Sequence, residues 1–399
     1  MNTKTKFGIS IGIIIAVVIS SQSDNHGLFS NSESNTVKTV NNNNAESKTL
    51  RLGYFPNVNH AQAIIGLKNG DFQKIIEGNN TNQGKIKINE FVFSAGPSAI
   101  EALFGGQIDA AYVGPNPAIS GYIASGGEGL RIISGVASGG SVFIVRNDAG
   151  IESVKDLGGK KFASPQLGNT QDISLRKYLI NNGYNTVENG GNVTIAAIKP
   201  ADILTLMLKK EVDGAWVPEP WGARLVNEAN GKVFVDERDL WPPEGKFVTA
   251  NIIVRTDYLK ANPDVIEKLL EAHVNETLWI NNNKEKAVDE FNAQLKKLTG
   301  KTIPQAVLAN AVTKLDFTYN PIKLSLIKDA NDAYDLGLLQ KGKERPNLTN
   351  IYDLAILDKV LAQKGLDTIG GGNIASTINT GNNTSSNGTS GDALSDIVT

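Results

Sequence analysis

The sequence contains no cysteine, and only three of its 399 residues are histidine. Without cysteine, disulfide bonds, thiolate nucleophiles and Cys-based metal or iron–sulfur sites are excluded. His26, His60 and His273 are far apart in the chain, and neither a Gly-x-Ser-x-Gly elbow nor a phosphate-loop motif occurs. We therefore expect no catalytic residues, no metal, no cofactor and no enzymatic activity.

The sequence also lacks a strong charge of either sign. Its formal net charge is −2 and its pI is about 6.0, so it offers no basic field for nucleic acid, and we expect no nucleic-acid partner. With 40% hydrophobic and 20% charged residues the composition is that of a globular protein. A chain of this length predicts two compact units with appendages, and we expect a monomer.

Only one apolar run near the N-terminus is long enough to suggest targeting. Residues 7–19 follow Lys4 and Lys6, and this run is shorter than the ~20 residues of a membrane span but suits a signal peptide. Residues 1–21 are therefore predicted to be a signal peptide or an uncleaved N-terminal anchor, and the protein to be exported to the periplasm or the cell surface. The Asn- and Ser-rich residues 22–48 and the Gly/Asn/Ser/Thr-rich residues 368–399 are expected to be a disordered tether and tail.

Strand-like and helix-like segments alternate from residue 49 onward, which predicts α/β lobes with mixed, mainly parallel sheets flanked by crossover helices. We place lobe 1 at residues 49–140 plus 251–367, including C-terminal helices, and lobe 2 at 141–250. The long helix that begins at Asn262-Pro263 has a suitable cap and first turn. His273 lies on its apolar face, as expected for a hydrogen-bonded core histidine.

One helix-to-strand unit occurs twice. Residues 97–113 (PSAIEALFGGQIDAAYV) align without gaps on residues 201–217 (ADILTLMLKKEVDGAWV), so that Asp109 matches Asp213. The first copy leads into Gly-Pro-Asn-Pro and the second into Pro-Glu-Pro, which predicts two similar lobes that each end a strand in a proline-rich lip. The alternative is a chance similarity, because helix–strand steps are common in α/β chains.

Ligands of open α/β sheets lie beyond the carboxyl ends of the strands. The segments expected there are 55–60, 94–98, 114–117, 168–172 and 216–221, two of which are polar helix starts whose free N–H groups favour an anion. The candidate ligand-binding residues are Asn57, His60, Ser94, Gly96, Ser98, Asn116, Gly168, Asn169, Thr170, Gln171, Trp216, Glu219 and Trp221. Helix capping without a ligand is the alternative for the 94–98 and 168–172 segments, and a structural role for His60.

Four motifs together resemble one family. PQLGNTQD (165–172), DGAWVPEPW (213–221), DAAYVGPNP (109–117) and the helix start at 262–263 are similar to those of solute-binding proteins of ABC importers in the nitrate/sulfonate/taurine group, over residues 49–365. The resemblance implies a two-lobed periplasmic-binding-protein-like fold of type II, hinge strands between the lobes, and delivery of a small ligand to an ABC permease and its ATPase. It implies anion-binding loops at 94–98 and 168–171, with Trp216 and Glu219 on the opposite wall. The N-terminus departs from the usual bacterial lipoprotein pattern, because the lipid-bearing cysteine is missing.

None of the five segments contains Lys or Arg, whereas Glu219 would repel a simple anion. One hypothesis is therefore a zwitterionic ligand such as taurine, with its sulfonate at Gly168–Gln171 and its ammonium at Glu219. The alternative is that Glu219 accepts hydrogen bonds from the backbone of the lip, in which case a plain alkanesulfonate, nitrate or bicarbonate fits. A branch that binds or makes pyrimidine precursors of thiamin is a further alternative.

Overall fold

The computed structural model describes residues 48–77, 86–339 and 345–370. The predicted signal peptide or anchor, the tether up to residue 47 and the predicted tail from residue 371 lie outside the described residues. Within the described ranges, no helix combines the length and the apolar character needed to cross a membrane.

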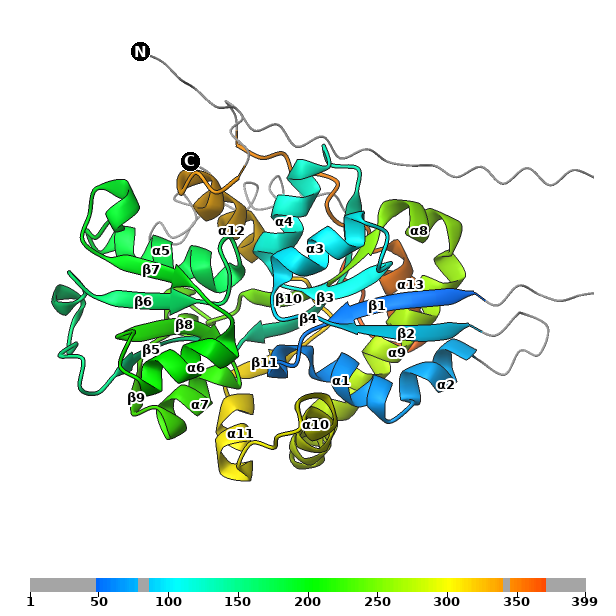
Figure 1. Cartoon of the computed structure of the whole chain (residues 1–399). Helices are drawn as coiled ribbons and strands as arrows, with labels where there is room; N and C mark the ends of the chain where they lie inside the picture. Colours follow the sequence, from blue (N-terminus) through cyan, green and yellow to red (C-terminus); the bar gives the residue numbers. More distant parts are fainter. Residues whose placement is uncertain (1–47, 78–85, 340–344, 371–399) are drawn as a thin grey trace, which may run out of the picture. The chain divides into compact units, whose positions relative to one another are not determined.

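The first of two sheets has six strands in the order β11-β4-β10-β3-β1-β2 (Figure 1). Their bounds are β1 Thr49–Tyr54, β2 Lys87–Val92, β3 Ala110–Val113, β4 Leu130–Gly139, β10 Val248–Arg255 and β11 Leu315–Phe317. β1 runs parallel to β2 and β3, whereas β10 is antiparallel to β3 and β4, and β11 is antiparallel to β4.

The second sheet has five strands in the order β7-β6-β8-β5-β9. Their bounds are β5 Ser141–Arg146, β6 Lys161–Ser164, β7 Thr194–Ala197, β8 Gly214–Pro218 and β9 Gly231–Asp236. β6 is parallel to β7 and β8, and β5 is antiparallel to β8 and β9. Both sheets are thus mixed, as predicted, but antiparallel pairs are as prominent as parallel ones, so "mainly parallel" was wrong. For four of the five antiparallel pairs the reason is that β5 or β10 enters its sheet from the other sheet without an intervening α-helix, and β11 adds the fifth pair beside β4.

Helices cover both faces of each sheet, which is the layered arrangement expected of an α/β chain. The helices are α1 Ala61–Lys68, α2 Asp71–Glu77, α3 Gly96–Phe104, α4 Pro115–Ala124, α5 Thr170–Asn181, α6 Pro200–Leu208, α7 Trp221–Glu228, α8 Thr256–Ala261, α9 Pro263–Asn282, α10 Lys284–Thr299, α11 Gln305–Val312, α12 Lys323–Asp335 and α13 Ala355–Gln363. On the first sheet, α3, α4 and α12 share one hydrophobic core, and α1, α2, α9, α10, α11 and α13 share the other. On the second sheet α5 packs on one face and α6 with α7 on the other.

The chain crosses between the sheets at two points. β4 ends at Gly139 and β5 begins at Ser141, with Gly139 and Gly140 at φ 76° and 73°, a left-handed conformation that glycine adopts without steric cost. The return crossing follows the short 3₁₀ helix η4, Glu237–Leu240, and enters β10.

The two copies of the sequence repeat occupy equivalent places. α3 and β3 in the first sheet correspond to α6 and β8 in the second. Asp109 Oδ2 accepts a hydrogen bond from the N–H of Arg51 in β1 at 2.9 Å, and Asp213 Oδ2 accepts one from the N–H of Lys161 in β6 at 2.8 Å. Each aspartate therefore fixes the register between its strand and the parallel neighbour, which explains why the repeat keeps it.

His273 is a fully buried core residue. Its Nδ1 is 3.0 Å from the Tyr112 hydroxyl and its Nε2 is 2.9 Å from the Gly135 carbonyl oxygen. Burial lowers the pKa of His273 to about 4, so the ring is neutral at pH 7. This is the hydrogen-bonded core histidine that the apolar helix face predicted.

Candidate functional site

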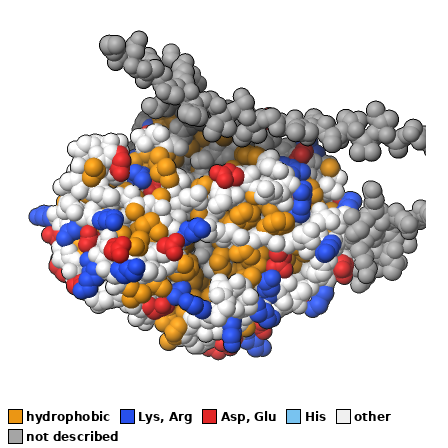
Figure 2. All heavy atoms as spheres, viewed as in Figure 1, with side chains coloured by type: hydrophobic (Ala, Val, Ile, Leu, Met, Phe, Trp, Pro, Cys, Tyr) orange, Lys and Arg blue, Asp and Glu red, His pale blue; other side chains and the backbone are white. Residues whose placement is uncertain are grey.

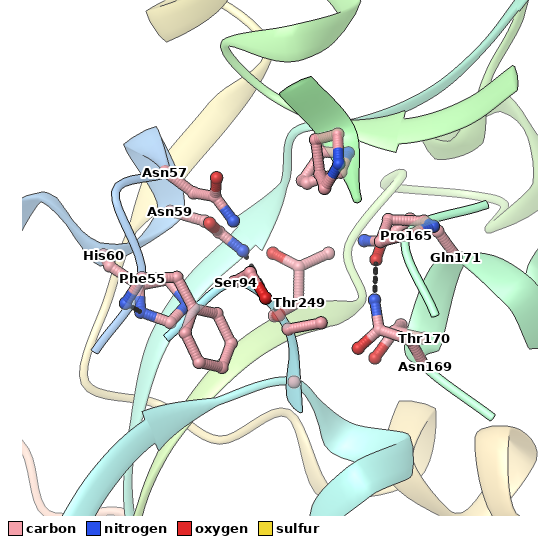
Figure 3. A pocket seen from close by; sticks show the side chains of 14 residues that line it. Phe55, Asn57, Asn59, His60, Ser94, Pro165, Asn169, Thr170, Gln171 and Thr249 are labelled. Atoms are coloured by element: carbon pink, nitrogen blue, oxygen red, sulfur yellow. Dashed lines mark hydrogen bonds between the residues drawn. The ribbon is translucent and has the colours of Figure 1, made fainter. Parts of the chain in front are cut away.

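A small cavity lies where the strand ends of the two sheets face each other (Figure 3). Its walls come from the loop after β1 and the β2–α3 turn in the first sheet, from the start of α5 and the end of β8 in the second, and from β10. The space open to the centre of a water molecule is about 20 Å³. Six of the predicted site residues line it: Asn57, His60, Ser94, Asn169, Thr170 and Gln171.

Hydrogen bonds within the wall orient two side chains so that donors remain free. Asn57 Oδ1 accepts from the indole N–H of Trp221 at 3.2 Å, which leaves the Asn57 Nδ2 as a donor. His60 Nδ1 accepts from the N–H of Phe55 at 3.2 Å, so the ring proton lies on Nε2. Burial lowers the pKa of His60 to about 3, and the ring is therefore a neutral donor.

The start of α5 forms the opposite wall. Asn169 is the N-cap, and its Nδ2 donates to Gln171 Oε1 at 2.8 Å, which leaves the Gln171 Nε2 as a donor. Thr170 is only 3% exposed, and its Oγ1 has no hydrogen-bond partner among the described residues. The first N–H groups of a helix also lack intrahelical acceptors, so this wall presents N–H and O–H groups to the cavity.

No charged side chain belongs to the cavity wall that the described residues form. Its fourteen lining residues include neither Lys, Arg, Asp nor Glu. Elsewhere on the molecule, Lys and Arg lie among Asp and Glu on the left and lower parts of the face in Figure 2, whereas hydrophobic and uncharged groups fill most of its middle. Asn59 also lines the cavity, and its Oδ1 is a buried acceptor without a partner within the described ranges.

Glu219 lies beside the cavity but does not line it. The residue is fully buried, Oε1 is 2.6 Å from Lys314 Nζ, and Oε2 accepts from the N–H of Ala223 in α7 at 2.9 Å. Its carbonyl oxygen accepts from the N–H of Val58 at 3.0 Å. Glu219 thus accepts a backbone hydrogen bond, as in the second alternative of the sequence analysis. Its carboxylate is also paired with Lys314, a contact that the sequence did not reveal.

The two tryptophans take different places. Trp216 is fully buried in the core of the second sheet, where its indole N–H donates to Glu237 Oε2 at 2.7 Å and its ring stacks on Phe143. The structure therefore assigns Trp216 to the core and not to the cavity wall, because β8 is a central strand covered on both faces. Trp221 does not line the cavity, but its indole N–H holds the side chain of Asn57, which does.

The remaining predicted residues support the walls. Asn116 Nδ2 donates to the Asp329 carbonyl oxygen at 3.1 Å, and the Gly168 N–H donates to Asp172 Oδ2 at 3.0 Å. Ser98 Oγ donates to the Ala95 carbonyl oxygen at 3.3 Å. A Cβ at Gly96 would collide with Pro117, so this glycine allows the close approach of α3 to α4. None of these four residues lines the cavity.

Three wall residues lie outside the five predicted segments: Pro165, Pro200 and Thr249. Thr249 belongs to β10 and lies two residues before the predicted boundary of lobe 1 at residue 251. Pro200 begins α6 and occupies the position of Gly96 in the aligned repeat. Its match to Gly96 in the repeat could therefore have predicted that Pro200 lies at the site. Thr249 reaches the cavity because β10 pairs antiparallel with its neighbours, and the sequence pattern of a single strand does not reveal its pairing.

Two mixed sheets flanked by helices, joined by two crossings and enclosing a polar cavity, define a periplasmic-binding-protein-like fold. Solved structures agree: the periplasmic nitrate-binding protein NrtA from Synechocystis matches with a TM-score of 0.64 and 17% identity, over 80% of this chain and 89% of that one. The alkanesulfonate-binding protein SsuA from Xanthomonas axonopodis bound to MOPS matches with a TM-score of 0.61 and 19% identity, over 74% and 96%.

Sequence comparison identifies the family. The model of the NMT1-like family matches residues 43–292, and the chain belongs to this family. A putative aliphatic sulfonates-binding protein of Bacillus subtilis is 25% identical over 79% of this chain and 89% of its own. A nitrate/nitrite binding protein of Nostoc is 30% identical over 134 residues, which span 33% of this chain and only 29% of the relative.

Proposed function

We propose that this protein captures a small monoanion through its oxyanion head, a sulfonate or a nitrate-like group, in the cavity between the two sheets. The observation that carries the proposal is the neutral, donor-rich wall. Asn57, His60, Thr170 and Gln171 each have an N–H or O–H group available, and an anion held by several neutral donors needs no lysine or arginine.

The size of the cavity supports a small head group. A cavity needs about 10–15 Å³ of such space to hold one water, so about 20 Å³ admits only a compact group in this closed arrangement. A ligand with a longer tail requires the sheets to part along the two crossings, with lobe 1 at 49–140 plus 251–367 moving against lobe 2 at 141–250. X-ray scattering measures this closure as a smaller radius of gyration when ligand is added.

A second candidate is a ligand that also carries a hydrogen-bond donor. Asn59 Oδ1 is an acceptor without a partner within the described residues, and taurine or bicarbonate would each supply a proton to it. The comparison of taurine with 1-propanesulfonate, which has a methyl group in place of the ammonium, separates the two candidates. Tighter binding of taurine favours the donor-bearing ligand, and equal or weaker binding favours the plain anion.

The family and the names of the relatives support a role in transport. We infer that the protein is exported, delivers its ligand to an ABC permease with its ATPase, and does not catalyse a reaction. Reconstitution with a candidate permease tests the delivery step. Ligand-stimulated ATP hydrolysis that depends on this protein is the expected result, and an enzymatic product formed from a bound pyrimidine would contradict the proposal.

The decisive experiment is calorimetry with nitrate, bicarbonate, methanesulfonate, taurine and MOPS on the parent protein and on Thr170→Val. A hydrogen bond to a charged group contributes about 1.5–3 kcal/mol, so the variant should bind about tenfold to a hundredfold more weakly. Thr256→Val is the matched control, because Thr256 is also buried with an unpartnered Oγ1 among the described residues but begins α8, away from the cavity. Equal affinities of the two variants, or no binding of any anion by the parent, would contradict the proposed site.

A further inference from the structure

A second hollow lies between α2 and α9, apart from the cavity described above. These helices pack against each other on the first sheet, and the groove has a volume of about 410 Å³. Its lining includes Asn69, Asp71, Lys74, Glu276 and Trp279. Trp279 is partly exposed and packs against the hydrophobic core of the first sheet.

Glu276 is the unusual residue of this groove. It is only 6% exposed, and its Oε1 has no hydrogen-bond partner in the part of the chain that the structure describes. Burial, together with the charges of Asp71 and Glu290, raises the pKa of Glu276 to about 7. A buried carboxylate without a donor is costly, and its presence needs an explanation.

A second acceptor close by is also unpartnered. Gln294 donates through Nε2 to Asn69 Oδ1 at 2.8 Å, while its own Oε1 is buried without a donor among the described residues. The cation in the lining, Lys74, is 2.9 Å from Asp71 and its side chain is 74% exposed. The described lining of the groove therefore holds two carboxyl groups and one ammonium group, and Glu276 Oε1 in it has no hydrogen-bond donor.

We propose that this groove binds the ammonium group of an organic amine, with Glu276 as its carboxylate partner. An ammonium supplies three N–H donors and a positive charge, which matches unpartnered acceptors better than a neutral ligand does. The ring of Trp279 provides a face for the alkyl chain and for a cation–π contact. A metal ion fits less well, because the described residues contain no cluster of three or more His, Asp or Glu side chains placed to coordinate one.

The amine has two possible sources, a free small molecule or a lysine side chain of a partner protein. Propylammonium and the blocked lysine N-acetyl-lysine methylamide probe the two sources on the full-length protein. Titration followed by the indole N–H resonance of Trp279 should give saturable binding with a Kd on the order of 1 mM for a single ammonium group. Binding of propylammonium alone indicates a free amine, and binding of both probes indicates that a lysine side chain can also enter.

Two variants make the test specific. Glu276→Gln should weaken binding at least about tenfold and should fold well, because it removes an uncompensated buried charge. Glu285→Gln, at an exposed glutamate of α10, is the matched control and should bind like the parent. Binding by the parent should strengthen from pH 6 to pH 8 as Glu276 ionises. No saturable binding of either probe, or equal binding by the Glu276→Gln variant and the parent, would overturn the proposal.

Discussion

The ion pair between Lys314 and Glu219 leads to the sharpest stability prediction. Lys314 precedes β11 of the first sheet, whereas Glu219 follows β8 of the second. Their side chains are 12% and 0% exposed, and Nζ and Oε1 are 2.6 Å apart. In Lys314→Met the carboxylate remains fully buried with one hydrogen bond, from the N–H of Ala223 at 2.9 Å.

The loss of stability in Lys314→Met comes from the Glu219 carboxylate, which stays buried without a positive partner. Removing one partner of a buried ion pair typically destabilises a protein by about 3–5 kcal/mol, because the remaining charge is uncompensated. Lys314 retains some exposure, so water can reach part of the gap, and we expect about 3 kcal/mol. Glu219→Gln combined with Lys314→Met removes both charges and should recover a large part of this loss.

Urea unfolding of the parent, both single variants and the double variant measures the coupling between the two residues. Lys359→Met is the matched control, because Lys359 lies 2.7 Å from Glu267 but the two side chains are 55% and 28% exposed. Exposed pairs contribute at most about 1 kcal/mol. A loss for Lys314→Met no larger than that of the control, or additive single and double variants, would refute the idea that Glu219 needs a partner in the protein.

Three further changes test other parts of the structure. A Cβ at Gly114 would lie 2.5 Å from Thr170 Oγ1, so Gly114→Ala should hold the sheets apart and weaken anion binding at least about tenfold, a loss of about 1.4 kcal/mol, as calorimetry would show. Equal affinity for parent and variant would argue against closure at this contact. His273 has a folded pKa of about 4 against about 6.5 when unfolded, so its contribution to stability should fall as pH drops from 6.5 towards 4. Urea titrations at several pH values should show a smaller decline for His273→Gln, and an unchanged decline would contradict the assignment. Glu276 has its pKa raised to about 7, so it costs stability as pH rises from 4.5 through 7, and Glu276→Gln should stabilise the protein by about 1–3 kcal/mol at pH 8 but little at pH 4. The same gain at both pH values would contradict that reasoning.

The duplicated unit shows how far the sequence could predict the fold. Its two copies lie where the alignment placed them, with Asp109 and Asp213 in equivalent hydrogen bonds, because helix periodicity and strand ends are local properties of the chain. The antiparallel insertion of β5 and β10 was not predicted. Strand direction depends on which sheet a segment enters after a crossing, and no local pattern carries that information.

The candidate site was predicted in part for the same reason. The helix start at Thr170 and the turn around Asn57 are local features, and both line the cavity. Glu219 and Trp216 look like site residues in a motif with two prolines, yet their environment is set by distant partners. Lys314 is 95 positions from Glu219 and Glu237 is 21 positions from Trp216, so neither contact was visible in the sequence.

The neutral wall of the cavity has a consequence for the medium in which the protein works. Attraction between an anion and a lysine-rich surface weakens as dissolved ions accumulate, since screening lengths shrink to about 3 Å at 1 M salt. Short contacts from amides, hydroxyls and helix N–H groups inside a closed cavity lie within that distance. Charge screening by salt should therefore weaken the binding of an anion in this cavity less than it weakens binding to a lysine-rich surface.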